Sequence, residues 1–245
     1  MNCDKKKKTL DLSLLIGGII ITLLVSVAFN CAWYIIVNSI LAIFCVFTQA
    51  KGMISTQFLG LIWSLFYIYI AYPQRLYGEV ILSVIIIMPM YIYGIIHWLR
   101  NRQQDSGVVI INSKLSKRET WIVIVAFCVV SVGVYFLLKA LNTNLLIMST
   151  IAFISILPAL YLLMRRHKLN LIFFLINDVV YFILWIILSI SGQLEMIVMA
   201  IGNLLQAVYD IYGIINWKKI ENEQNRIAIV KEHKTIDVSD TDNDA

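Results

Sequence analysis

Long apolar stretches constrain this chain more than any other feature of its sequence. A helix that spans a bilayer needs about 20 mostly apolar residues. Eight stretches qualify: Leu12–Phe29, Cys31–Gln49, Met53–Tyr72, Tyr77–Leu99, Trp121–Leu138, Leu145–Met164, Leu169–Ile190 and Leu194–Trp217. Their apolar residues are continuous rather than alternating, which excludes the strands of a membrane barrel. We therefore predict an all-α integral membrane protein, a helical bundle with eight spans.

Composition supports a lipid rather than an aqueous surrounding. Hydrophobic residues make up 60% of the chain and charged residues 14%, whereas soluble domains are about 45–50% apolar and about 25% charged. The lipid bilayer is thus an expected partner. The net charge of +5 comes from short basic clusters between apolar stretches, the pattern of membrane-flanking charges. We expect no binding of nucleic acid.

The basic residues predict the orientation of the spans. With the N-terminus inside, most of the Lys and Arg fall in inside segments, and the outside turns hold only Arg75 and Lys139. This asymmetry is typical of cytoplasmic loops, so we predict a multi-pass protein of the bacterial inner membrane with both termini cytoplasmic. Whether Leu12–Phe29 is retained is left open, because Lys5–Lys8 precede it as in a signal peptide. Its removal would leave seven spans.

An internal repeat is the most specific signal. Ile92–Trp98 recurs as Ile211–Trp217 and differs only where His97 is matched by Asn216. A weaker correspondence pairs the segment from Lys51 to Gly60 with that from Lys168 to Asn177. Two parallel three-helix repeats of this kind are typical of transporters, whose substrate site lies between the halves. Trp98 and Trp217 lie beside basic residues, and we expect both to anchor at the membrane interface.

The repeat divides the chain into five parts. A linker helix, Trp121–Leu138, joins the two triplets. The expected parts are a basic N-terminus with an additional helix (1–30), the first three-helix repeat (31–99), a cytoplasmic basic loop with the linker helix (100–144), the second three-helix repeat (145–217) and a cytoplasmic polar tail (218–245).

Candidate binding residues are the polar and aromatic side chains inside the spans. Asp178 lies near mid-membrane, where acids are costly and are functional candidates by default. On its helix, Phe174, Asn177 and Tyr181 share one face with it. A carboxylate among aromatic rings suits a positively charged ring, through charge pairing and cation–π contact. The alternative is a structural hydrogen bond between helices.

Two other helices present similar groups. Gly60, Trp63, Ser64 and Tyr67 repeat the same spacing in the first triplet, although such aromatic stripes are more often packing surfaces. Asn203 and Gln206 share a face of the last span, where interhelical hydrogen bonding is the alternative. We expect Asp210 to face the cytoplasmic mouth and Glu79 to be solvated at the outer end of its helix.

Over about Cys31–Lys219 the chain resembles the PnuC family, carriers of nicotinamide riboside that are similar in architecture to the SWEET sugar transporters. The resemblance is carried by Phe58-x-Gly60-Leu61-Ile62, by the helix Tyr77…Tyr93-Gly94…Trp98 and by Leu175-Ile176-Asn177. It implies a fold of three helices, a linker and three helices. Leu12–Phe29 lies outside that pattern and is an addition.

Two departures from the family pattern bear on the ligand. The family has a Gln where Ser83 stands. Its W-x-x-W-x-x-x-N run corresponds here to Asn170-Leu-Ile-Phe173-Phe174-Leu-Ile-Asn177, which keeps the Asn and one aromatic. By this resemblance Ser83 and Phe173 are further candidate substrate-binding residues. Because some relatives carry thiamine or nucleosides instead, the resemblance leaves the identity of the substrate open.

These observations predict a membrane transporter for nicotinamide riboside or a closely related vitamin or nucleoside. By the resemblance, it works by facilitated diffusion with alternating access, and phosphorylation in the cytoplasm traps the substrate. A thiamine or deoxynucleoside carrier is the first alternative, and a membrane sensor or scaffold is the second. The four cysteines form no CxxC pair or Cys/His cluster, and we expect no metal, no cofactor and no enzymatic activity. The oligomeric state is left open, a homo-oligomer included.

Overall fold

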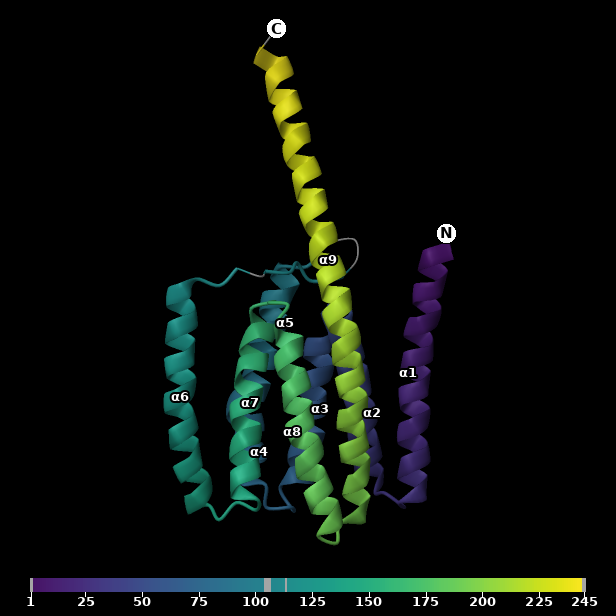
Figure 1. Ribbon diagram of the computed structural model, residues 1–245, viewed down its shortest axis with the longest axis vertical. Coiled ribbons are helices and arrows are strands. Elements are labelled where there is room, and N and C mark those ends of the chain that lie inside the picture. The colour runs from purple at the N-terminus through teal and green to yellow at the C-terminus, as the bar shows by residue number, and fades with distance from the viewer. Residues whose placement is uncertain (1, 104–106, 113, 244–245) are drawn as a thin grey trace.

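The computed structural model describes the backbone of residues 2–103, 107–112 and 114–243, all of it helices and their connections (Figure 1). The predicted basic cluster Lys5–Lys8 and the acidic end of the tail have side chains outside the described residues. The α-helices are α1 (Asn2–Ala28), α2 (Trp33–Ala50), α3 (Ser55–Ala71), α4 (Tyr77–Leu82), α5 (Met88–Arg100), α6 (Lys117–Ala140), α7 (Leu146–Met164), α8 (Asn170–Ile190) and α9 (Ile197–Asn243).

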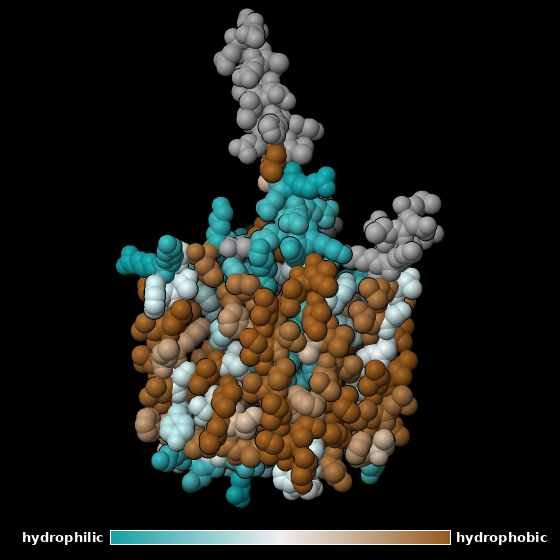
Figure 2. All heavy atoms as spheres, in the orientation of Figure 1, coloured by the Kyte–Doolittle hydropathy of each residue, from teal (hydrophilic) through white to brown (hydrophobic). Residues whose placement is uncertain are grey.

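The helices form an upright bundle with an apolar belt. Seven described helical segments are long and apolar enough to cross a membrane, while α3, at 17 residues, is a shorter apolar helix. Brown, apolar residues cover the middle of the bundle and teal, polar residues gather at its two ends (Figure 2). α1 begins and α9 ends on the same side (Figure 1). We call that side the basic end, because Lys51, Arg100 and Arg165 lie there, and the other side the far end.

One span is built from three pieces. α4, the π-helical segment η1 (Ser83–Ile87) and α5 continue one another as the span Tyr77–Arg100. Pro89 lies in the first turn of α5, where its missing N–H and its ring would break regular α-helical hydrogen bonding. The wider turn of η1 accommodates this disruption. Ile87, the last residue of η1, is 4% exposed, and π-helical turns are frequent at functional sites.

The core of the bundle lies between the two predicted triplets. α8 packs against α7 and α9, and α2 packs against α3 and α9. α6 stands to one side (Figure 1), with 11% of its most apolar 18 residues buried. α1 docks through Asp11, which is 2.8 Å from Nζ of Lys51 and accepts a 2.5 Å hydrogen bond from Tyr212.

The repeated motif folds into a reciprocal contact at the basic end. The rings of Trp98 and Trp217 lie 6.3 Å apart, and both side chains are fully buried. Trp98 Nε1 donates to the carbonyl of Leu163 in α7, at 3.3 Å, and Trp217 Nε1 donates to that of Gln49 in α2, at 2.8 Å. The prediction that both indoles anchor at the interface is therefore wrong. Each gives a second donor to a carbonyl in the last turn of a helix, which otherwise accepts only from the turn that follows.

The turns that follow α2 and α7 correct the weaker sequence correspondence. The N–H of Gly52 bonds the carbonyl of Gln49, and the N–H of Arg166 bonds that of Leu163. The backbone hydrogen bonds of the next residues in the two turns match in the same way. Lys51 therefore corresponds to Arg165 rather than to Lys168. With that spacing, the stripe Gly60, Trp63, Ser64 and Tyr67 falls on Phe174, Asn177, Asp178 and Tyr181.

A short extended segment crosses the basic end. This strap, Gly107–Asn112, lies against the turn after α2, where the N–H of Val109 bonds the carbonyl of Gly52 at 2.9 Å. It also lies against the turn after α7, where Arg166 Nη1 bonds the carbonyl of Ile110 at 2.9 Å. Gln224 of α9 completes the contact: its Oε1 accepts from the N–H of Ile111 and its Nε2 donates to the carbonyl of Val109. The strap thus joins three parts of the bundle.

Candidate functional site

A cavity lies inside the bundle, between α2, α3, α5, α7, α8 and α9. The volume that the centre of a water molecule can occupy in this cavity is about 80 Å³. By the same measure, about 10–15 Å³ is enough to hold one water. The residues that line it are Asn38, Ser39, Ala42, Cys45, Val46, Gln49, Trp63, Tyr67, Ile87, Tyr91, Ile156, Leu160, Phe174, Asn177, Asp178, Tyr181, Trp185, Met199, Gly202, Asn203, Gln206 and Asp210. They combine aromatic, amide and carboxyl groups, the mixture that fixes a small ligand by shape and by a few polar contacts.

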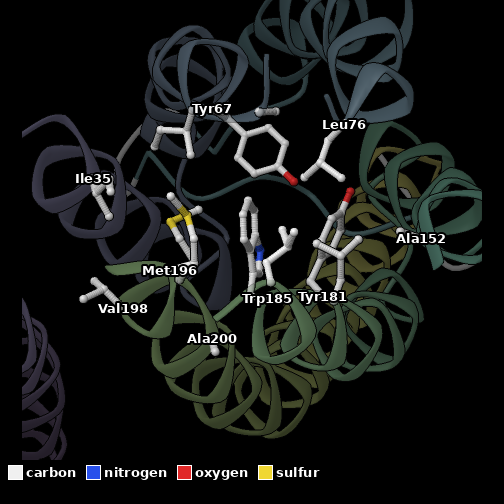
Figure 3. Packing of buried hydrophobic residues seen from close by; sticks show 14 residues of the cluster. Ile35, Tyr67, Leu76, Ala152, Tyr181, Trp185, Met196, Val198 and Ala200 are labelled. Atoms are coloured by element: carbon white, nitrogen blue, oxygen red, sulfur yellow. The ribbon is translucent and has the colours of Figure 1, made fainter. Parts of the chain in front are cut away.

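Aromatic rings form one wall of the cavity. Trp63 and Tyr67 are stacked with centroids 4.8 Å apart, and Tyr67 meets the edges of Tyr181 and Trp185 at 6.3 and 6.2 Å. Figure 3 shows the ring of Tyr67, from α3, facing the rings of Tyr181 and Trp185, from α8. Gly60 lets Tyr91 join them, since a Cβ at Gly60 would collide with the Tyr91 ring. The wall offers π-faces to a flat or cationic ring.

Two acids face the cavity. Asp178 of α8 is 6% exposed and Asp210 of α9 is 1% exposed, and their carboxyl groups lie close enough to interact with each other. Both oxygens of Asp210 and Oδ2 of Asp178 have no hydrogen-bond partner among the described residues. The expectation that Asp210 faces the cytoplasmic mouth is wrong, because the neighbouring helices cover it. Among the described residues of the lining, none is Lys, Arg or His.

A polar patch from α2 and α9 completes the lining of the cavity. Asn38 Nδ2 and Ser39 Oγ contact the sulfur of Met199 at 3.7 and 3.8 Å. Oδ1 of Asn38, which is 1% exposed, has no partner among the described residues. Asn203 donates to the carbonyl of Met199 at 2.8 Å. Sequence reasoning missed Asn38, although a polar pair in the middle of an apolar span is itself a signal for function.

The far side of the cavity is closed by a buried carboxylate. Tyr67 Oη donates to Glu79 Oε2 at 3.2 Å, and Tyr181 Oη donates a short hydrogen bond to the same oxygen. Figure 3 shows the two hydroxyl groups converging. Glu79 is 1% exposed, so the expectation that it is solvated is wrong. The three residues link α3, α4 and α8 through side chains alone.

Most of the predicted site residues come together here. Those that line the cavity are Trp63, Tyr67, Phe174, Asn177, Asp178, Tyr181, Asn203 and Gln206. Ser83 and Phe173 do not: Ser83 is fully buried in η1, and Phe173 packs against the apolar cluster that contains Leu171. Asn177 lines the cavity but uses its Nδ2 within the bundle, donating to Ser155 Oγ at 2.7 Å. That bond joins α8 to α7.

The sequence matches a family model and curated proteins that are described as transporters. Residues 32–219 match a family model described as nicotinamide mononucleotide transporter. Two curated relatives are named nicotinamide riboside transporter PnuC. The Neisseria mucosa protein is 23% identical over 192 residues, which cover 77% of this chain and 73% of that protein. The Haemophilus influenzae protein is 25% identical over 200 residues, which cover 79% and 83%.

A solved structure supports the same fold. The crystal structure of the vitamin B3 transporter PnuC superposes with a TM-score of 0.77 at 22% identity, over 87% of this chain and 92% of that one. The predicted all-α membrane fold is thereby confirmed. Because the family model spans more than half of the residues, this chain belongs to the nicotinamide mononucleotide transporter family, as the resemblance to PnuC predicted.

Proposed function

We propose that the chain carries nicotinamide riboside, or a closely related vitamin or nucleoside with a positively charged ring, across the bacterial inner membrane. The cavity carries the proposal: it places Asp178 and Asp210 beside a wall of aromatic rings, with none of its described lining residues basic. Nicotinamide riboside has a fixed positive charge on a flat pyridinium ring. Carboxylates and π-faces are the groups that bind such a ring.

The proposed mechanism is facilitated diffusion by alternating access. The matching turns after α2 and α7, and the reciprocal hydrogen bonds of Trp98 and Trp217, support two related three-helix halves with α6 as the linker. The cavity lies between those halves, as substrate sites of repeat-built transporters do. Rocking of the halves would open either end in turn. The chain would make or break no bond of the substrate and so would not be an enzyme, and phosphorylation in the cytoplasm would trap the substrate.

The proposed orientation puts the basic end in the cytoplasm, with both chain termini. Lys51, Arg165 and Lys168 lie at that end, while Arg75 and Lys139 lie at the other. The excess of basic residues on one side supports this placement. A reporter enzyme that is active only outside the cytoplasm, fused after residue 245, tests it: we expect no activity there and activity when the fusion follows Arg75.

Uptake by vesicles tests the transport proposal. The purified chain in liposomes is given radiolabelled nicotinamide riboside, thiamine or a deoxynucleoside, beside liposomes without protein. We expect nicotinamide riboside to equilibrate without accumulating. Uptake of thiamine alone would mean that the ligand is cationic but is not nicotinamide riboside. Uptake of a neutral deoxynucleoside alone would mean that Asp178 and Asp210 do not bind a cationic ligand. No uptake of any of them would contradict the proposal.

A matched pair of variants tests the site. Asp178→Asn keeps the size of the side chain and removes its charge, and we expect the affinity for the cation to fall about 10- to 100-fold, since a hydrogen bond to a charged group contributes about 1.5–3 kcal/mol. Glu223→Gln is the control, because Glu223 lies exposed on α9 beyond the cavity. Binding measured by calorimetry should be unchanged there. Equal affinities of Asp178→Asn and wild type for the cation would show that Asp178 does not contribute to binding.

A further inference from the structure

The acid pair in the cavity lacks the partners that buried carboxylates normally have. Asp178 and Asp210 lie on the neighbouring helices α8 and α9 and interact with each other. Three of their four carboxyl oxygens have no hydrogen-bond partner among the described residues. Buried charges are expected to be paired, because leaving water is costly for them. The pair is therefore incomplete as it stands.

A second group in the same cavity is short of a donor. Asn38 Oδ1 is an acceptor on the α2 side of the lining, 1% exposed and without a partner among the described residues. The nearby amide of Asn203 donates to the carbonyl of Met199. Four such acceptor oxygens from α2, α8 and α9 thus face one cavity, against one donor of the described lining without a partner, Nε1 of Trp63. Such a site suits a ligand that brings positive charge or hydrogen-bond donors.

The titratable groups around the pair do not supply the missing charge. Cys45 of α2 faces Asp210, and Tyr181 of α8 faces Asp178. Tyr91 of α5 and Tyr67 of α3 complete the titratable lining. Each of these groups is neutral when protonated, and none can carry a positive charge. Lys51, on the same helix as Cys45, forms its ion pair with Asp11 instead.

Two carboxylates side by side in a site of low dielectric cannot both ionise easily. Their repulsion is strong where water is excluded, so such pairs hold a proton between them. A cation that enters the cavity offsets the repulsion between the two carboxylates, so the shared proton is no longer needed to offset it. With a proton or with a singly charged cation beside two carboxylates, the net charge of the site is the same.

We propose that Asp178 and Asp210 form an exchange site for a single positive charge, which holds one proton when the cavity is free of cations and releases it when a cationic ring binds. The O–H bond of the shared carboxyl breaks, the proton passes to water, and no covalent bond forms with the ligand. The proposal rests on the proposed function in its choice of ligand. It also gives a basis for selectivity, because a neutral ligand of the same shape cannot displace the proton.

Calorimetry on the full chain tests this proposal. Binding of nicotinamide riboside is measured at one pH in two buffers with different heats of ionisation, which gives the number of protons released. We expect about one proton per bound ligand, and an affinity that rises up to about tenfold per pH unit while the pair still holds its proton. The reduced 1,4-dihydro form of the riboside has nearly the same shape and no charge. It should bind more weakly and release no proton.

Variants locate the proton. Asp210→Asn removes the second carboxyl and gives Asp178 an amide donor, and we expect the release to fall toward zero. Asp178→Asn should do the same, and the exposed Glu223→Gln should keep the wild-type release. Binding without proton release in wild type would overturn the exchange proposal and leave the transport proposal intact. Absence of binding by any cationic ligand would overturn both. The wild-type measurement decides even where a variant fails to fold.

Discussion

The two ends of the cavity are closed by different kinds of contact. At the basic end, the indoles of Trp98 and Trp217 donate to backbone carbonyls of α7 and α2. The strap bonds the turns after those two helices and the side chain of Gln224 in α9. At the far end, two tyrosine hydroxyls meet the single carboxylate of Glu79. At the basic end each of these contacts has at least one backbone partner, which the fold fixes, whereas at the far end both partners are side chains, which can rotate away. The far end is therefore the closure that can open with the smaller rearrangement.

The largest effect is expected from the basic end. Trp217→Ala empties a fully buried ring position and leaves the carbonyl of Gln49 without its indole donor. Truncation of a buried Trp costs about 3–5 kcal/mol, which lowers the thermal midpoint by on the order of 10 °C for a chain of this size. Thermal unfolding in detergent, followed by the loss of monodisperse protein, measures the change.

The control for this variant is Trp121→Ala. Trp121 is 68% exposed at the start of α6, so its truncation should leave the thermal midpoint within a few degrees of wild type. If Trp217→Ala behaves like Trp121→Ala, the basic end does not depend on its indoles. The contrast between the two closures would then disappear.

The far end should show a smaller effect that a conservative change repairs. Glu79→Ala leaves the hydroxyls of Tyr67 and Tyr181 buried without their acceptor, at a cost of about 1–3 kcal/mol. Glu79→Gln restores an acceptor oxygen without the charge and should recover most of the loss. Thermal unfolding of the two variants beside wild type gives the measurement. Equal losses in both would mean that the charge, rather than the hydrogen bonds, holds the far end together.

The sequence predicted what depends on a residue's own position along a helix. The spans follow from the length of the apolar stretches. The stripe of Phe174, Asn177, Asp178 and Tyr181 follows from helical spacing, and its members line the cavity. A stripe predicts which side chains share a face. A stripe does not identify the helix that packs against that face. The wrong predictions concern this packing between helices.

The errors at Trp217, Glu79 and Asp210 share one cause. Each prediction rests on the residue's distance from a helix end, whereas the residue is buried by others distant in sequence. Glu79 lies in the first turn of α4, yet Tyr181 of α8 covers it. Ser83, taken from a family pattern rather than from its surroundings, lies outside the cavity lining. Long-range packing decides these cases, and helical periodicity carries no information about it.

The smallest effect is expected at the strap, and it separates local opening from global stability. Gln224→Ala removes the acceptor of the Ile111 N–H and the donor to the carbonyl of Val109. Each such bond contributes about 0.5–1.5 kcal/mol, and the strap lies at the end of the bundle rather than in its core. We expect amide hydrogen exchange to accelerate over 107–112 and to stay unchanged in α8.

Gln224→Glu keeps the acceptor for Ile111 and loses the donor, so exchange at Ile111 should be slower than in Gln224→Ala. Acceleration throughout the bundle would mean that the strap contributes to the stability of the whole fold, and the basic end would then be a single closure rather than a Trp pair with a separable strap.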